Sequence, residues 1–226
     1  MKKLSKKYVA AKALVEKGKQ YSVAEAAELV KKTAMTNFDS TVEVSFNLNI
    51  NTKQPDQQLR GTISLPNGNG KTKKILAITG TKVEEAKAAG ADYVGGVELL
   101  EKIKTENWFD FDIIVATPDM MGQLGRMGRV LGPKGLMPNP KSGTVSMDIG
   151  KAVKEIKNGK VAYRADKDGN VHFSVARCSF DADKIAENIQ AVIDMIVRIR
   201  PSAVKGIYLK NATVHSTMGP AIRLAV

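Results

Sequence analysis

Apolar and polar residues alternate in two separate parts of this 226-residue chain. Between residues 39 and 50, Val, Phe, Leu and Ile alternate with Thr, Glu, Ser and Asn, which predicts a strand with one buried and one polar face. A shorter strand is expected over 59–65. The alternation returns at 161–164 and 171–176, on either side of Asp-Lys-Asp-Gly-Asn at 166–170, a sequence typical of a hairpin turn. With a last strand expected over 206–214, these parts predict an antiparallel, half-buried sheet.

Helical spacing of apolar residues occurs around these strands. Residues 2–17 predict one helix, and Ser22 followed three residues later by Glu25 predicts a capping box at the start of a second. Asp181 is expected to cap a third, longer helix. The apolar face of that helix would be formed by Ile185, Ile189, Val192, Ile193, Ile196 and Val197.

The middle of the chain has a different pattern, in which short apolar strands alternate with helices. Strands are expected over 75–78, 91–94 and 112–116, and helices over 81–89, 97–104 and 148–158, with Thr81 capping the first helix. Another helix is expected to start near Pro118, since proline suits a first helical turn. Short buried strands that alternate with helices predict a parallel sheet with right-handed crossovers.

These two patterns predict two domains, with a boundary at the turn-rich, basic segment that begins at Pro66. The expected fold is a discontinuous α+β domain, formed by residues 1–67 and 160–226, with an antiparallel sheet and covering helices. A three-layer α/β Rossmann-like domain, residues 68–159, is inserted into it.

Charge adds to this picture, because 35 Lys+Arg against 23 Asp+Glu give a net charge of +12. The flanking residues 1–67 and 160–226 carry 21 Lys+Arg and 12 Asp+Glu, so that net +9 falls on the discontinuous domain. Such a balance favours nucleic acid or another anionic surface as the partner. A single cysteine and the absence of an apolar run near ~20 residues indicate a cytoplasmic protein with no membrane partner.

The segment 121–145 contains six glycines, three prolines and four cations, without an acidic residue. Glycine allows close backbone approach and proline stiffens the chain, so a bare cationic loop here would suit a phosphate-rich surface. The alternative is an ordinary long loop, with Leu131, Leu136 and Met137 packed under the domain. The composition alone favours neither interpretation.

Catalytic and metal-binding motifs are hard to find in this sequence. Only His172 and His215 could act as an imidazole base, and neither lies in a recognisable triad or metal motif. Gly70-Lys71-Thr72 resembles the end of a phosphate-binding loop, but that motif needs glycine where Leu65 stands. We therefore expect no cofactor, no metal and no enzymatic activity. The alternative is a nucleotide-dependent enzyme that uses the middle domain.

A binding surface is the better-supported expectation. Polar and basic residues on the flanking strands and turns could share the open face of one sheet: Arg164, Lys167, His172, Ser174, Lys210 and the Ser216–Gly219 turn. Phe38 could stack on a base or a ribose, or instead plug the core. Structured RNA suits this set better than duplex DNA, because no helix is typical of a basic recognition helix.

The run GRVLGPKGLMPNPKSGTV at 128–145 resembles the signature of the bacterial large-subunit ribosomal protein L-one family. Further runs that resemble this family are NFDSTVEV (37–44), LRGTISLPNGNGK (59–71), FDIIVATPDMM (111–121), YRADKDGNVH (163–172) and STMGP (216–220). The resemblance covers essentially the whole chain. The sequence departs from the family at Asn51-Thr52-Lys53, where a basic segment is common, and at Ala221, where glycine is frequent.

This resemblance implies a ribosomal protein that binds large-subunit rRNA at the mobile stalk beside the exit site and aids release of deacylated tRNA. It also implies repression of translation through the leader of its own mRNA, contacts with other ribosomal components, and a monomer when free. A free cytosolic repressor that does not reside on the ribosome remains the alternative. By motif position, the implied RNA contacts are Phe38, Thr41, Arg164, Lys167, Ser174, Thr217, Met218 and Gly219. Lys134 and Lys141 would make a secondary RNA contact.

Overall fold

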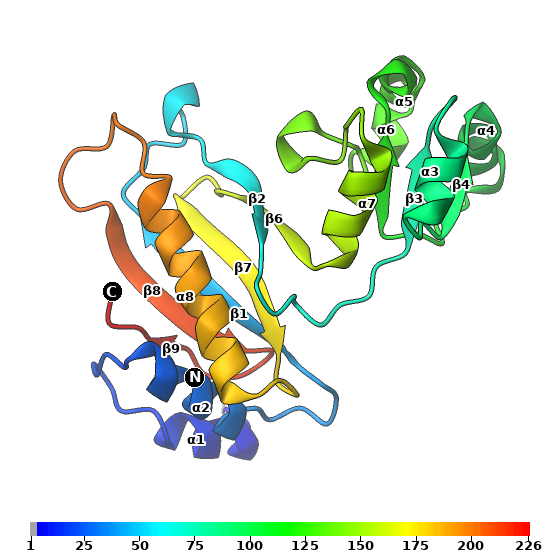
Figure 1. The fold of residues 1–226 in the computed structure, drawn as a ribbon. Coiled ribbons are helices and arrows are strands. Elements are labelled where there is room, and N and C mark those ends of the chain that lie inside the picture. Colours follow the sequence, from blue (N-terminus) through cyan, green and yellow to red (C-terminus); the bar gives the residue numbers. More distant parts are fainter. Residues whose placement is uncertain (1–3) are drawn as a thin grey trace. The chain divides into compact units, whose positions relative to one another are not determined.

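The fold was analysed in a computed structural model that describes residues 4–226 and divides into two compact units (Figure 1). Unit 1 joins Met1–Gly70 with Val161–Val226, and unit 2 is Lys71–Lys160. Within residues 4–226, unit 1 contains two sheets and unit 2 contains one, and each unit has its own hydrophobic core. Among the described residues, no helix has the length and apolar character needed to cross a membrane.

The main sheet of unit 1 has four strands in the order β7-β1-β8-β9, all antiparallel. Their bounds are Asn170–Arg177 for β7, Thr41–Leu48 for β1, Leu209–Ser216 for β8 and Ile222–Arg223 for β9. In β1 the side chains of Val42, Val44, Phe46 and Leu48 are buried, while the residues between them stay partly exposed. The predicted half-buried strand is therefore confirmed.

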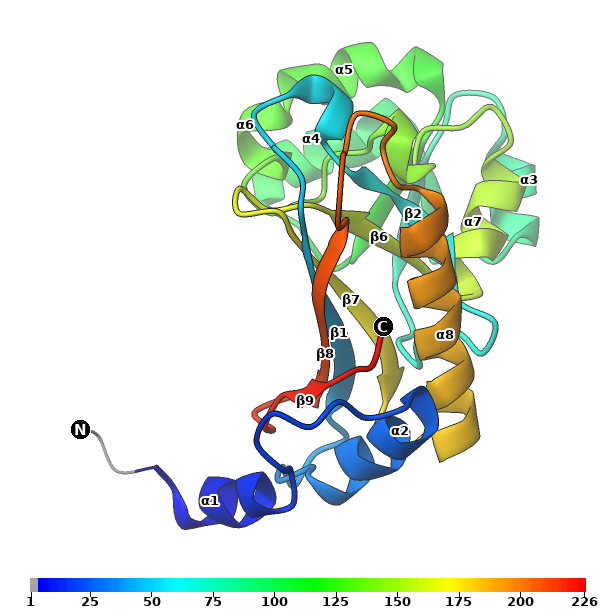
Figure 2. The same cartoon turned by 90° about the vertical axis from the view of Figure 1, so that its left-hand side faces the viewer.

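Helices α2 (Val23–Lys32) and α8 (Ala182–Arg198) pack on the apolar face of this sheet, and Figure 2 shows α8 along one side of it. The predicted capping box of Ser22 and Glu25 is present at the start of α2. Asp181 occupies the N-cap position of α8 as predicted, but its side chain makes no capping bond and instead pairs with Lys184 at 3.0 Å. The placement of Val197 on the apolar face was wrong, because Val197 lies off the buried face and is 57% exposed.

A second, two-stranded sheet in unit 1 pairs β2 (Arg60–Ser64) with β6 (Lys160–Arg164). The expected hairpin was therefore wrong: the 166–170 turn connects two sheets, because β6 pairs with β2 while β7 pairs with β1. The two sheets share one core, since the Tyr163 and Phe173 rings lie 5.1 Å apart. A Cβ at position 61 would lie 2.7 Å from Tyr163 Oη, so Gly61 makes this packing possible.

The N-terminal helix α1 (Lys6–Ala13) is shorter than the predicted 2–17, of which residues 2 and 3 lie outside the described part. The Ser5 side chain accepts a hydrogen bond from the Tyr8 N–H at 3.2 Å, which sets the first helical turn after Ser5. After α1 the chain returns to the sheet at Tyr21, which forms a bridge with Leu224.

Unit 2 contains a parallel sheet in the order β4-β3-β5, as predicted, with bounds Tyr93–Gly95, Ile75–Ile78 and Ile113–Ala116. Both faces are buried. Leu76, Ile78 and Ile114 face a cluster that includes residues of α4 (Val97–Glu106), and Ile75, Ala77 and Val115 face one with residues of α3 (Val83–Ala88) and α7 (Ile149–Lys157).

The start of α3 differs from the prediction that Thr81 caps it. Lys82 occupies the cap position without a side-chain bond, and Thr79 Oγ1 instead accepts the Lys82 N–H at 3.1 Å. Thr79 lies at the end of β3, where its buried hydroxyl can reach the first backbone groups of the following turn. The hydroxyl that holds the helix start thus comes from the strand end rather than from the turn.

The first half of the glycine-rich segment is helical rather than a bare loop. A 3₁₀ turn, η2 (Pro118–Met120), leads into α5 (Met121–Arg126) and α6 (Gly128–Leu131), which confirms a helical start near Pro118. Leu124 and Leu131 are fully buried, and Leu136 and Met137 pack against the same core cluster. The packing interpretation therefore applies to these side chains. The rest of the segment contains one further 3₁₀ turn, η3 (Pro140–Ser142).

Candidate nucleic-acid interface

The polar face of the main sheet in unit 1 consists of three rows of side chains that cross the strands. The register places these side chains opposite one another on β7, β1 and β8: Ser174–Glu43–His215, His172–Ser45–Thr213 and Asn170–Asn47–Asn211. The middle row continues onto β9, where Arg223 lies opposite Thr213. Because directly opposed side chains on one face lie within about 4.5–5.5 Å at Cβ, each row is a continuous band of hydrogen-bonding groups.

Hydrogen bonds between neighbouring strands fix several of these groups in place. Ser45 Oγ and His172 Nδ1 lie 2.8 Å apart, and the Asn47 amide donates to Asn170 Oδ1 at 2.7 Å. Ser174 Oγ and Asn211 Oδ1 are buried and have no hydrogen-bond partner among the described residues. An unpaired buried polar atom costs the fold about 1–3 kcal/mol.

One end of this face is held together by Thr41 and Thr217. The Thr41 N–H donates to Thr217 Oγ1 at 3.1 Å, the Thr217 N–H donates to the Thr41 carbonyl at 3.0 Å, and the Thr217 hydroxyl is 3.3 Å from the same carbonyl. Thr217 thereby ties the turn after β8 to the first residue of β1, although 176 positions separate the two residues in the chain.

The turn after β8 presents Met218 to solvent in an unusual conformation. Met218 has φ 65° and is 75% exposed. A left-handed conformation costs a non-glycine residue about 1–2 kcal/mol, so the surrounding turn must enforce it. The Gly219 N–H donates to the Ser216 carbonyl at 2.8 Å, and a Cβ at position 219 would overlap Ser216 Oγ. Glycine is required at 219 by this contact.

Phe38 lies in the segment just before β1 and is 61% exposed, so the interpretation as a core plug was wrong. Its carbonyl accepts a hydrogen bond from Thr36 Oγ1 at 3.0 Å. Nearby, the Arg177 guanidinium donates to the Asp39 carbonyl at 2.9 Å and lies 3.3 Å from Thr41 Oγ1. Sequence reasoning missed Arg177, which the register places opposite Thr41.

Lys167 and Arg164 lie at the opposite end of β7 from Arg177 and Thr41. The Lys167 carbonyl accepts a hydrogen bond from Thr52 Oγ1 at 2.8 Å, and its side chain is exposed, as is that of Arg164. Strand β1 extends about 20 Å from Thr41 to Asn47, at ~3.3 Å per residue. Asn47 pairs with Asn170, which follows the turn that contains Lys167, so about this distance separates Lys167 from Thr41. The predicted contacts in unit 1 thus fall into two groups, with Ser174 between them.

Asp166 organises the turn that carries Lys167. Its Oδ1 accepts the Asp168 N–H at 3.0 Å and the Asn170 N–H at 2.7 Å, as is typical of an aspartate that stabilises a turn. Burial acts to raise the pKa of the Asp166 carboxyl. The hydrogen bonds from Asn170 and Asp168 together outweigh this effect, so the pKa of Asp166 is lowered. The turn therefore keeps its charged, bonded form at neutral pH.

In unit 2, Lys134 and Lys141 have different surroundings. Lys134 Nζ lies 4.1 Å from the centroid of the Phe109 ring, a distance at which a cation–π interaction holds the ammonium group. Lys141 is exposed in η3, and its N–H donates to Asn139 Oδ1 at 2.8 Å. Lys134 is thus a positioned cation, whereas only the backbone of Lys141 is fixed.

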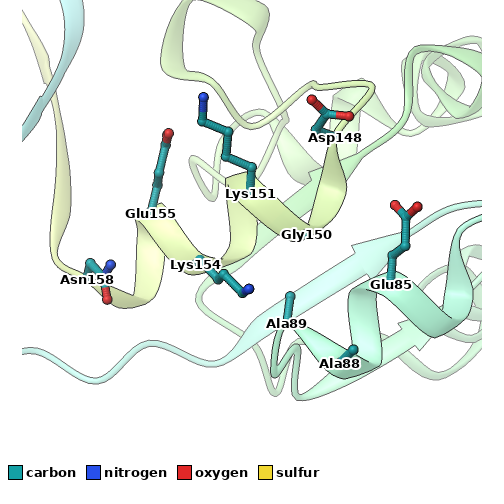
Figure 3. A pocket seen from close by; sticks show the side chains of 9 residues that line it. All are labelled: Glu85, Ala88, Ala89, Asp148, Gly150, Lys151, Lys154, Glu155 and Asn158. Atoms are coloured by element: carbon teal, nitrogen blue, oxygen red, sulfur yellow. The ribbon is translucent and has the colours of Figure 1, made fainter.

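Unit 2 also has an open groove of about 620 Å³ between α3 and α7 (Figure 3). Its floor is made by Ala88, Ala89 and Gly150, and its rim carries both carboxylates and ammonium groups. This mixture differs from the glycine-rich, purely donating cradle that binds nucleotide phosphates. Among residues 4–226, no group of three or more His, Cys, Asp or Glu side chains is placed to hold a metal ion.

Comparison with known proteins identifies the family of this chain. The family described as "Ribosomal protein L1p/L10e family" matches residues 30–220. The chain is 58% identical over 224 residues, 99% of both chains, to a protein of Mycoplasma capricolum subsp. capricolum. It is 54% identical over 226 residues, 100% of both chains, to a protein of Mesoplasma florum. Both relatives bear the name "Large ribosomal subunit protein uL1", and the chain therefore belongs to the uL1 family of ribosomal proteins.

Proposed function

We propose that this protein is a non-enzymatic constituent of the large ribosomal subunit that binds folded rRNA through unit 1. The binding surface is the polar face of β7, β1 and β8 together with the Thr217–Gly219 turn. The observation that carries the proposal is this turn, in which an exposed Met218 is held in a left-handed conformation by bonds to β1. Strain maintained at an exposed position is typical of a binding site.

The chemistry of the surface fits RNA. Hydroxyl and amide side chains can donate to phosphates, ribose hydroxyls and base edges, and the exposed Phe38 ring can stack on an unpaired base. The hydroxyl of Ser174 has no partner among the described residues, and it would have to turn outward from its buried position to bond to a ribose 2′-OH or to a phosphate. The net charge of +9 on the flanking residues favours a polyanion as the partner.

The proposed RNA is the stalk region of the large-subunit rRNA beside the exit site, as the family relationship suggests. In this proposal, unit 1 is a discontinuous α+β domain, and unit 2 is a three-layer Rossmann-like domain inserted into it. Lys134 and Lys141 make a secondary contact from unit 2. The protein aids release of deacylated tRNA, and it represses its own mRNA when a leader segment presents the same RNA shape to the same surface.

Filter binding tests this proposal with a stalk rRNA fragment and a scrambled RNA of equal length. We expect the stalk fragment to bind at least ~10³-fold more tightly, as is typical of specific nucleic-acid recognition. If ~5–8 phosphates are neutralised, the log–log slope of affinity against salt should be about −4 to −7. Equal affinity for the two RNAs would contradict the proposal.

The ribosomal and repressor roles need separate measurements. Co-sedimentation with large subunits in high salt should retain the protein, whereas a free repressor would stay in the supernatant. A reporter under the protein's own mRNA leader should lose translation when the protein is added. It should regain translation when the added protein carries a Thr217→Ala substitution.

A further inference from the structure

A hollow lined by several cations lies in unit 1 next to the Thr217–Gly219 turn. It measures about 290 Å³ and lies between α1 and β9, and we refer to it as the α1–β9 hollow. One wall is formed by α1 and the segment after it, with Tyr8, Lys12 and Lys17, and the other by Pro220 and Arg223. The hollow therefore combines an apolar surface, from Tyr8 and Pro220, with cationic groups on both walls.

Tyr21 fixes the two walls relative to each other. Its ring is buried, its N–H donates to the Arg223 carbonyl at 2.9 Å, and its hydroxyl accepts the Glu16 N–H at 3.0 Å. The Ala225 N–H donates to the Tyr21 carbonyl at 2.9 Å. These bonds hold the 15–19 segment and β9 in a defined geometry, so the hollow is a preformed feature of the fold.

The charge of the hollow is strongly positive. Four cations line it, Lys12, Lys17, Lys19 and Arg223, together with one carboxylate, Glu16. Glu16 pairs with Lys19 at 3.2 Å, and Lys19 also lies 5.0 Å from the centroid of the Tyr21 ring. The other three cations have no ion-pair partner among residues 4–226. Like charges gathered around one hollow repel one another, and an anion between them removes that repulsion.

The position of the hollow indicates which anion it takes. Pro220 directly follows Gly219, and Arg223 continues the row of polar side chains that runs from His172 through Ser45 and Thr213. A polyanion that lies on the turn and on this row meets Arg223 at the edge of the sheet. A chain of linked phosphates can occupy both places at once, which a free phosphate ion cannot.

We infer that the α1–β9 hollow binds phosphodiester groups of the same RNA that contacts the Thr217–Gly219 turn. Lys17 and Arg223 hold one phosphate from opposite walls, Lys12 adds to the positive field, and Tyr8 and Pro220 contact the adjoining ribose. This inference rests on the proposed function and adds a contact that extends the RNA path over the edge of the sheet.

The test uses the full-length protein with the paired substitution Lys17→Gln/Arg223→Gln and the stalk rRNA fragment. Because each neutralised phosphate contributes about 0.7–0.9 to the slope, we expect the magnitude of the salt slope to fall by about 1–2. Affinity near physiological salt should fall by roughly 10-fold, with most of that loss abolished at high salt. Lys17→Arg/Arg223→Lys keeps both charges and should retain the wild-type slope.

A matched control removes two charges from the helices that cover the other face of the sheet. Lys32 on α2 and Lys184 on α8 are exposed and pair with Glu28 and Asp181, so Lys32→Gln/Lys184→Gln changes the net charge equally. It should leave the slope unchanged. An equal decrease in slope for the control and the hollow variant would assign the effect to overall charge and overturn the inference.

Two further outcomes separate this inference from the proposed function. If Thr217→Ala weakens binding while Lys17→Gln/Arg223→Gln keeps the wild-type slope, RNA lies on the turn but not in the hollow, and only the inference fails. If the wild-type protein does not distinguish the stalk fragment from scrambled RNA, the proposed function fails first. Hydroxyl-radical footprinting should show the hollow variant losing protection at one short run of sugars, and an unchanged footprint would also overturn the inference.

Discussion

The two units of the molecule use their sheets in opposite ways. The main sheet of unit 1 has long antiparallel strands with one apolar and one polar face, and both helices packed on it lie on the apolar face. The sheet of unit 2 has strands of only three or four residues, and apolar clusters cover both of its faces. Unit 1 therefore retains a face for recognition, whereas in unit 2 only loops and helix surfaces are available.

This difference explains where the candidate contacts lie. In unit 1 they project from the sheet itself or from a turn bonded to it, as Thr217 is bonded to Thr41. In unit 2, Lys134 lies in the loop after α6 and is positioned by one aromatic ring. Sites built on strands are held more precisely than sites on loops. The comparison therefore predicts that the main RNA affinity comes from unit 1 and a smaller, more adaptable part from unit 2.

Neighbouring residues in one strand give the largest expected contrast. In β1, Phe46→Ala should lower the free energy of unfolding by about 3–5 kcal/mol, while Ser45→Ala should cost less than ~1.5 kcal/mol, because Phe46 is buried and Ser45 lies on the polar face. In β3, Ile75→Ala and Leu76→Ala should each cost about 2–5 kcal/mol, since both residues are fully buried.

Urea unfolding measures these four values, and the single tryptophan helps to assign them. Trp108 is the only tryptophan in the chain and lies in unit 2, so its fluorescence reports that unit, while far-UV circular dichroism reports both. The proposed difference between the units would be contradicted if the unfolding free energies of Ile75→Ala and Leu76→Ala differed as widely as those of Phe46→Ala and Ser45→Ala. It would also be contradicted if Ser45→Ala cost as much as Phe46→Ala.

The next effect concerns binding. Thr217→Ala should weaken binding of the stalk rRNA fragment by about 1–3 kcal/mol, because the Thr41 N–H loses its partner and only the backbone bond from the Thr217 N–H to the Thr41 carbonyl still ties the turn to β1. Thr217→Ser keeps the hydroxyl and should bind nearly as the wild type does. In unit 2, Lys134→Gln should cost less than 1 kcal/mol. A loss for Lys134→Gln that exceeds the Thr217→Ala loss would reverse the assignment of the main surface.

Periodicity predicted most of the elements, because each depends on which neighbouring side chains are buried together. The alternation of 39–50 predicted β1, and the short apolar runs predicted the parallel sheet of unit 2. Local signals failed where another residue made the expected bond or another strand made the expected pairing. Thr81 does not cap α3 because Thr79 reaches the same backbone, and the turn at 166–170 does not join paired strands because β6 pairs with β2.

The site was only partly predictable for the same reason. Motif resemblance proposed Thr41 and Thr217 as RNA contacts, which stays a prediction, but nothing in the sequence indicated that they bond to each other across 176 positions. Arg177 was missed because only the β1–β7 register places it beside Thr41. The α1–β9 hollow depends on a backbone bridge between Tyr21 and Leu224, which no local pattern predicts.

The smallest expected effect separates strain from contact at position 218. Met218→Gly should raise the free energy of unfolding by about 0.5–1 kcal/mol, because glycine adopts the left-handed conformation without a steric penalty and this gain exceeds its entropic cost. The same substitution removes an exposed side chain from the proposed RNA surface, so affinity for the stalk fragment should fall. Stability and binding would then change in opposite directions.

Unit 2 supplies a matched control for that experiment. Asn107, at the C-terminal end of α4, is the one other non-glycine residue with positive φ, 51°, within residues 4–226. Asn107→Gly should change stability by less than ~0.5 kcal/mol, since asparagine tolerates this conformation better than methionine does. It should leave RNA binding unaltered. Should Met218→Gly bind RNA as tightly as the wild type, the strained methionine would be a feature of the turn alone, and the contact would be made by the backbone around Gly219.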